Sequence, residues 1–227
     1  MTLLQQPKKL RVFVLFSGSA SAVRYLVDHD KNCDLTYEII GAFTDNEDAT
    51  AIEFFNELAP KDFQCEIFSL QTFCKWKNAT LKDGRMREEY FAVVHQCIAK
   101  YEPDLIICSG FMLIVPDSFL RQFPKKIINV HPADLTIEQD GRPRFTGRHA
   151  VKVAIDSGQE ALRSTVHYIE EGKGIDCGEI ICVSSHAVHV KKWYSAKWHQ
   201  GAMKQLCDGP AMRLALQNLT AHVPTAT

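Results

Sequence analysis

Several patterns that mark particular classes of protein are missing from this chain. None of its eight cysteines forms a CxxC pair, and its uninterrupted apolar runs fall far short of the roughly 20 residues that cross a bilayer. The formal net charge is −1 at pH 7, so no bulk field draws the protein to nucleic acid or acidic lipid. We therefore expect a cytoplasmic protein with reduced thiols, small-molecule substrates, and neither a membrane nor a nucleic-acid partner.

Targeting signals and the common nucleotide-binding loops are also missing. The first ten residues, MTLLQQPKKL, contain no apolar signal core. Neither GxGxxG nor GxxxxGK occurs. No repeat or linker divides the 227 residues, which predicts a single domain over 1–227 with frayed ends at 1–9 and 221–227.

Apolar segments of strand length alternate with segments of helical periodicity in the first part of the chain. The strand-like segments are 10–16, 37–44, 65–70, 104–109 and 126–130, and the helical ones are 22–29, 49–58 and 85–101. This alternation predicts an α/β, Rossmann-like fold with a mostly parallel twisted sheet and helices on both faces. The later segments predict an antiparallel strand pair, 164–171 and 179–190, followed by a terminal helix over 193–219.

The segment IINVHPAD, residues 127–134, places two polar side chains in a buried strand. Asn129 and His131 are two residues apart and therefore lie on one face of that strand. A lone histidine here would most simply be a hydrogen-bonded core residue, but a buried amide beside it needs partners too. An amide N–H and an imidazole N–H at the end of a parallel strand can together stabilise a developing oxyanion.

Three further positions admit two interpretations each. Asp176, between two glycines in GIDCG, is either a turn aspartate or a carboxylate that orients His131. The loop SGSAS, residues 17–21, is either an ordinary helix N-cap or an anion-binding turn. His167 shares a strand face with Thr165 and is by default a half-buried structural residue. The two histidines of HAVH would point to opposite faces, and we expect no metal site.

Four segments together resemble the formyltransferases that use 10-formyltetrahydrofolate. These segments are PDLIICSGFM, IINVHPADL, STVHYI and IDCGEII, and their order is most similar to that of the glycinamide ribonucleotide formyltransferases. The resemblance implies a Rossmann-like fold and a catalytic set of Asn129, His131 and Asp176. It implies formyl transfer from 10-formyltetrahydrofolate to a primary amine in purine biosynthesis, by a monomer or homodimer without a metal.

The resemblance also implies binding residues. Those expected to bind the acceptor substrate and its phosphate are Ser17, Gly18, Ser19, Ala20, Ser21, Arg87, His167 and Gln205. Those expected to bind the folate are Phe111, Met112, Leu113, Ile114, Val115, Gly147, His149, Gly174 and Ile175.

The chain departs from the family pattern mainly where the acceptor would bind. Ala20 and Ala22 replace a glycine and an asparagine of the phosphate loop, Leu113 replaces an arginine, and Gln205 replaces an acidic residue. The loop after His131 is longer and contributes the arginines 142, 144 and 148, which are either a second phosphate site or ordinary surface charge.

The acceptor therefore stays open at this point. Phosphoribosylglycinamide is the first candidate and a sugar-nucleotide amine the second. Methionyl-tRNA and hydrolase members of the family usually carry a further domain, so the length of this chain disfavours them. A non-catalytic folate-binding relative and a general nucleotide-binding Rossmann protein are the alternatives outside this chemistry.

Overall fold

The computed structural model describes residues 8–58, 63–80 and 83–221. Most of the ends that we expected to be frayed, 1–7 and 222–227, lie outside the described residues. The first elements in chain order are β1 (Leu10–Phe16), α1 (Ser21–His29), β2 (Tyr37–Thr44), α2 (Ile52–Leu58), β3 (Cys65–Ile67), α3 (Leu70–Trp76), α4 (Gly84–Ala99), β4 (Leu105–Cys108), α5 (Asp117–Leu120) and β5 (Ile127–His131). They are followed by β6 (Glu138–Gln139), β7 (Arg142–Pro143), α6 (Ala150–Asp156), β8 (Ala161–Leu162), β9 (Thr165–Tyr168), β10 (Ile180–Val183), β11 (Val188–His189), α7 (Ala196–Met203), a π-helical turn (Lys204–Asp208) and α8 (Gly209–Thr220).

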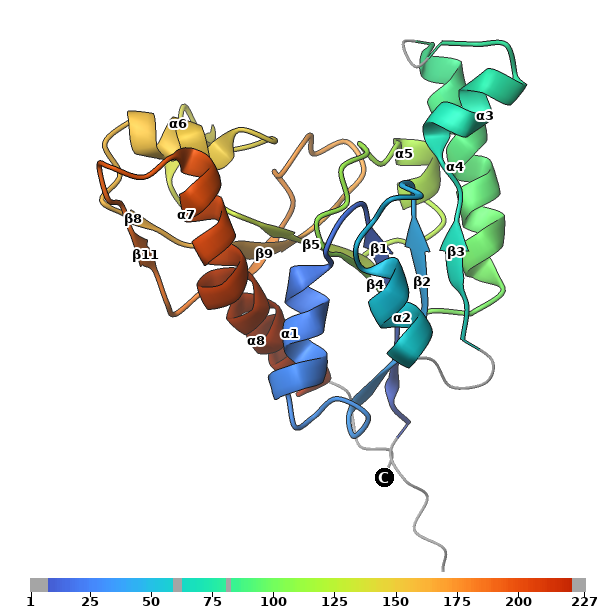
Figure 1. Ribbon diagram of the computed structural model, residues 1–227, viewed down its shortest axis with the longest axis horizontal. Coiled ribbons are helices and arrows are strands. Elements are labelled where there is room, and N and C mark those ends of the chain that lie inside the picture. Colours follow the sequence, from blue (N-terminus) through green and yellow to red (C-terminus); the bar gives the residue numbers. More distant parts are fainter. Residues whose placement is uncertain (1–7, 59–62, 81–82, 222–227) are drawn as a thin grey trace, which may run out of the picture.

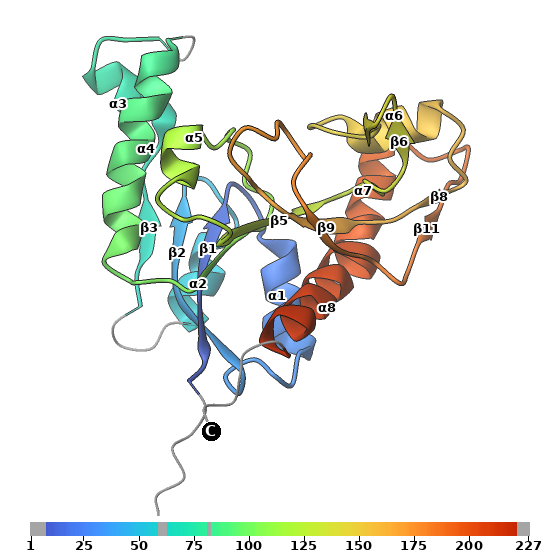
Figure 2. The ribbon, with the colours of Figure 1, turned by 180° about the vertical axis from the view of Figure 1, so that it is seen from behind.

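One sheet organises the molecule. Its seven strands lie in the order β10-β9-β5-β4-β1-β2-β3, and the pairs from β3 to β5 are parallel, whereas β9 is antiparallel to both β5 and β10. The predicted α/β, Rossmann-like fold is therefore confirmed. In both views α3 and α4 stand beside β3, and α6 and α7 lie at the opposite end of the molecule (Figures 1 and 2).

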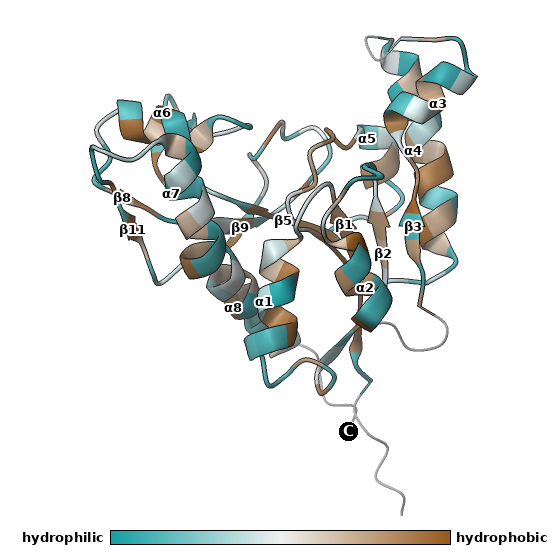
Figure 3. Cartoon of the chain, in the orientation of Figure 1, coloured by the Kyte–Doolittle hydropathy of each residue, from teal (hydrophilic) through white to brown (hydrophobic). Residues whose placement is uncertain are grey.

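Helices cover both faces of the parallel strands, which explains why these strands are apolar throughout. Along β1, Val12 and Val14 belong to the core shared with α1, α2 and α8, and the alternate residue Phe13 belongs to the core shared with α3, α4 and α5. Figure 3 shows the same arrangement, with mostly hydrophobic strands and helices that alternate between hydrophobic and hydrophilic faces. A sheet buried on both sides needs this composition.

Several predicted strands are shorter in the structure; the segment predicted over 164–171, for example, is reduced to β9. The segment predicted over 65–70 ends at Ile67, because the Ser69 side chain accepts a hydrogen bond from Thr72 N and begins helix α3 at Leu70. The segment predicted over 179–190 is split into β10 and β11. Between them the Ser184 hydroxyl donates to the carbonyl of His186, which bends the chain away from the large sheet.

The predicted terminal helix is interrupted by a π-helical turn. Helix α7 begins after Ser195, whose side chain accepts a hydrogen bond from Trp198 N, and α8 continues the same rod beyond Asp208. No helix among the described residues is long and apolar enough to cross a membrane.

Candidate active site

The register between β5 and β9 brings the polar side chains together. Asn129 lies directly opposite His167, and His131 lies directly opposite Thr165. Because side chains two apart on a strand share a face, all four lie on the same side of this antiparallel pair. His131, His167 and Thr165 are each at most 4% exposed. The two residues that the sequence singled out thus lie in a dense buried polar cluster.

Asp176 reaches this cluster from the loop between β9 and β10. Its Oδ2 lies 3.3 Å from His131 Nδ1, and its Oδ1 lies 3.4 Å from His167 Nε2. Asp176 has a φ of 55°, a left-handed conformation that aspartate tolerates better than most residues. The predicted convergence of Asn129, His131 and Asp176 is therefore present, with His167 as a fourth member.

Two backbone contacts fix the position of the Asp176 loop. The Gly147 N–H donates to Asp176 Oδ2 over 2.7 Å, which ties the loop to the segment that follows His131. Gly178 passes so close to β9 that a Cβ there would overlap the carbonyl oxygen of Tyr168. Glycine is therefore required at position 178, because any side chain there would prevent the loop from packing against β9 before it enters β10.

Backbone carbonyls determine which ring nitrogen of each histidine carries the proton in the neutral form. His131 Nε2 donates to the carbonyl of Phe145 over 2.7 Å, and His167 Nδ1 donates to the carbonyl of Tyr168 over 2.9 Å. The second nitrogen of each ring, which faces Asp176, therefore carries a proton only in the imidazolium form. Asp176 is placed to stabilise that form.

Burial and neighbouring charges shift the pKa values of this cluster in opposite directions. Burial lowers the pKa of His131, while the Asp176 carboxylate and the Phe145 carbonyl oppose this effect. Burial also acts to raise the pKa of Asp176, but the adjacent His167 ring, the charge on His131 and the Gly147 N–H bring that pKa below its ordinary value. Asp176 is thus held as a carboxylate, and the protonation of His131 depends on it.

The long loop after His131 is fastened to the cluster at both ends. At its start, Thr165 Oγ1 donates to the carbonyl of Ala133 over 2.7 Å and accepts from Leu135 N over 3.0 Å. At its end lie Phe145 and Gly147, which hold His131 and Asp176. Thr165 and Phe145 are functional positions that the sequence analysis missed, although the strand alternation already placed Thr165 on the face of His167.

The predicted phosphate loop lies between β1 and α1. Ala20 has a φ of 46°, which is a conformation that favours glycine, and it is buried. The Ser17 hydroxyl is already engaged, because it donates to Asp45 Oδ1 over 2.5 Å and accepts from Met112 N over 2.8 Å. Burial raises the pKa of Asp45, and the Ser17 hydroxyl opposes this shift. Asp45 is a third residue that the sequence analysis missed.

Among the described residues, no hydrogen bond joins the remaining predicted residues to the cluster. Met112 and Ile114, after β4, are 63% and 50% exposed, and Ile175 is 51% exposed. His149 is exposed at the start of α6, and Gln205 is exposed in the π-helical turn. Arg87 is half-buried in α4. His167, which the resemblance places among the residues that bind the acceptor and its phosphate, lies against Asp176. The described residues contain no group of histidine, cysteine and acidic side chains that could hold a metal ion.

Comparisons with known proteins relate this geometry to one family. A family model described as formyl transferase matches residues 10–200. Phosphoribosylglycinamide formyltransferase of Mycobacterium tuberculosis is 29% identical over 75% of this chain and 68% of its own length. The trifunctional purine biosynthetic protein adenosine-3 of Chironomus tentans is 30% identical over 79% of this chain, which spans only 12% of that protein. The structure of phosphoribosylglycinamide formyltransferase from Campylobacter jejuni has the same fold, with a TM-score of 0.71 at 24% identity, and the match covers 94% of this chain and 98% of that one.

Proposed function

The chain belongs to the formyl transferase family, and from this premise we propose that it transfers a formyl group from 10-formyltetrahydrofolate to a primary amine. The leading acceptor is phosphoribosylglycinamide, because relatives with that activity in their names match most of the chain. The observation that carries the proposal is the arrangement of Asn129 and His131 around the Asp176 carboxylate.

The proposed chemistry begins with attack of the acceptor amine on the formyl carbon. As the carbonyl electrons move to oxygen, the second N–H of Asn129 Nδ2 stabilises the oxyanion, and so does the Nδ1–H of His131 in the imidazolium form that Asp176 favours. The 3.3 Å separation of His131 Nδ1 from Asp176 is longer than a typical charge-assisted hydrogen bond of about 2.8 Å, so the same N–H can be shared with the oxyanion.

Proton movement completes the exchange. The attacking nitrogen loses one proton, which Asp176 accepts directly or through water, and N10 of the folate gains one as its bond to the formyl carbon breaks. The products are a formamide and tetrahydrofolate, so atoms and charge balance. Asp176 serves this step because it stays a carboxylate in a buried site.

The exposed apolar side chains beside the cluster suit the folate. Met112, Ile114 and Ile175 are large apolar side chains that are each at least half exposed, and contiguous apolar surface can mark a ligand-binding groove. They come from the segment after β4 and from the Asp176 loop, the two segments predicted to enclose the pterin. We assign the co-substrate to this region.

A second acceptor class is favoured by one observation. The Asp45 carboxylate bonds to Ser17 at the loop where the acceptor phosphate was expected. A carboxylate at this position disfavours a second anion nearby. This favours an acceptor whose phosphate binds elsewhere, such as the amine of a sugar nucleotide.

The test is an acceptor screen in which release of tetrahydrofolate is measured for phosphoribosylglycinamide and for a sugar-nucleotide amine. Asn129→Ala, His131→Ala and Asp176→Ala should each lower turnover by about 100-fold or more. His189→Ala, at an exposed histidine of β11, is the matched control and should retain full turnover. If the protein binds a folate analogue but shows no turnover with any amine, the proposed transferase function is wrong and the protein is a non-catalytic folate-binding protein.

A further inference from the structure

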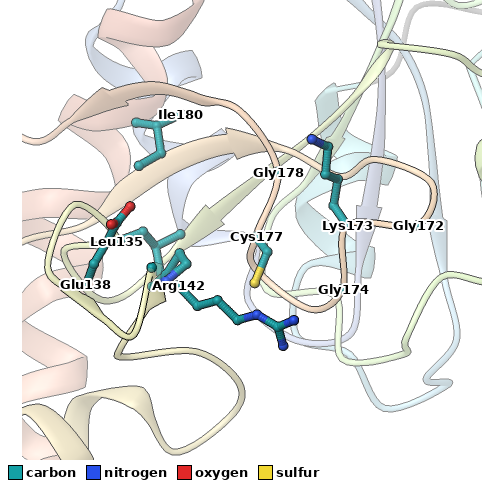
Figure 4. Close-up of a pocket in the computed structure, with 11 residues that line it drawn as sticks. Leu135, Glu138, Arg142, Gly172, Lys173, Gly174, Cys177, Gly178 and Ile180 are labelled. Atoms are coloured by element: carbon teal, nitrogen blue, oxygen red, sulfur yellow. The ribbon is translucent and has the colours of Figure 1, made fainter.

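A second pocket lies at the edge of the sheet, outside the cluster described above. It has a volume of about 630 Å³. One wall is the β6–β7 hairpin, the other is the loop of residues 172–178, and Ile180 of the edge strand β10 forms part of its floor. Figure 4 shows the side chain of Arg142 extending from the hairpin toward the loop that carries Gly174 and Cys177.

This pocket shares only the Asp176 loop with the proposed transfer site. Asn129, His131 and Asp176 do not line it, and Gly174 is its only member among the residues predicted to bind folate. The hairpin wall belongs to the part of the chain that is longer than the family pattern. The pocket is therefore a feature of this chain rather than part of the shared catalytic machinery.

The lining combines an apolar floor with two cations. Ile180, which is partly exposed, supplies the apolar surface, and Leu135 lies behind it and is buried. Arg142 and Lys173 lie on opposite walls of the pocket. Glu138 is the single acidic residue in the lining. Among the described residues, neither cation forms an ion pair, so both are available to a ligand. Two cations match a dianion, and the planar guanidinium can bind phosphate oxygens in pairs.

We propose that this pocket binds an organic phosphate, with the phosphate between Arg142 and Lys173 and an apolar body over Ile180. The volume lies within the roughly 300–1,000 Å³ typical of small-molecule sites and is much larger than a free phosphate ion requires. A bare phosphate would leave the apolar floor uncovered, so the body contributes to binding.

Phenyl phosphate is the probe, with phenol and inorganic phosphate as its two halves. Calorimetry should show binding of phenyl phosphate and weaker or absent binding of either half. The double variant Arg142→Ala/Lys173→Ala should bind phenyl phosphate about tenfold more weakly or worse. The variant Lys191→Ala/Lys192→Ala also removes two exposed positive charges, but away from the pocket, and should bind as the unmodified protein does.

Cys177 supplies a readout that is specific for this pocket. It lines the pocket and is partly exposed. Phenyl phosphate should slow the alkylation of Cys177 by iodoacetamide, as measured by mass spectrometry. It should leave the alkylation rates of the half-buried Cys33 and Cys97 unchanged. The proposal is overturned if Cys177 is not protected, if phenol protects it equally, or if the Arg142/Lys173 variant keeps full affinity. Displacement of the probe by an unreactive folate analogue would also overturn it, because the pocket would then belong to the transfer site.

Discussion

Asn129 Nδ2 lies 3.3 Å from His167 Nε2, across the β5–β9 pair. His167 donates its Nδ1–H to the Tyr168 carbonyl, so in the neutral ring Nε2 can only accept. This fixes the orientation of the Asn129 amide, with its NH₂ group toward the cluster and one N–H left for the substrate.

The first prediction concerns this orienting role of His167. His167→Ala should lower kcat by about 10-fold, because the amide loses its fixed orientation and Asp176 loses one partner. Asn129→Ala should cost about 100- to 1000-fold, since it removes the donor itself. Steady-state kinetics with both substrates checks this order. Equal losses in the two variants would mean that His167 itself contacts the reacting atoms.

The second prediction concerns the pH dependence that Asp176 imposes on His131. In Asp176→Asn the burial that lowers the pKa of His131 remains, and the opposing carboxylate is gone. The pKa of His131, already below its ordinary value, therefore falls further, so at a given pH a smaller fraction of the variant carries the Nδ1 proton. We expect a loss of about 100-fold or more in kcat/KM at pH 7.5, with the activity of the variant recovering relative to the unmodified protein as pH falls. A pH-independent ratio of the two activities would contradict this dependence.

The third prediction tests the hydroxyl that fastens the long loop. Thr165→Val leaves the Ala133 carbonyl and the Leu135 N–H without their partner. An unsatisfied buried group costs about 1–3 kcal/mol, and the loop end beside His131 is released. We expect a lower melting temperature together with a reduced kcat. Thr165→Ser keeps the hydroxyl and should restore both properties.

The fourth prediction tests the close approach at Gly178. Gly178→Ala places a methyl group on the Tyr168 carbonyl, so the loop that carries Asp176 must shift. Kinetics should show a loss of about 100-fold, the size expected for a displacement of about 1 Å. Gly84→Ala, at the start of α4 with open space around it, is the control and should leave activity unchanged.

The parallel part of the fold and the centre of the site were predictable because they depend on local patterns. The apolar strands and the pair of polar residues in β5 are visible in the order of the residues alone. The contacts of Thr165 and Phe145 were not, because they depend on the register between β5 and β9 and on a carbonyl oxygen that every residue possesses.

The β6–β7 hairpin had a local signal that went unused. Asp140 and Gly141 have φ values of 54° and 72°, the two positive angles of a tight hairpin turn for which Asp-Gly is a typical sequence. In contrast, Asp45 could not be foreseen at the predicted phosphate loop, since it follows β2 and meets Ser17 only through the strand order.

The last prediction concerns stability and rests on Asp208, a buried carboxylate at the end of the π-helical turn. Ser164 Oγ donates to its Oδ1 over 2.5 Å, and the side chain is otherwise removed from water. Burial raises the pKa of Asp208 to about 6. The native state therefore holds the proton more tightly than the unfolded chain, whose aspartates titrate near pH 3.9. The stability that this protonation contributes is present at low pH and is lost as pH rises through about 6.

Asp208→Asn removes this titration and keeps an oxygen that accepts from Ser164. The free energy of unfolding of the variant, relative to the unmodified protein, should rise between pH 4 and pH 8 by at most about 3 kcal/mol. Urea unfolding at a series of pH values measures this difference, and Asp28→Asn, at an exposed position of α1, controls for the loss of one charge. Parallel stability curves for Asp208→Asn and the unmodified protein would contradict the prediction. They would show that water or the ammonium group of Lys204 stabilises the ionised carboxylate in the native state.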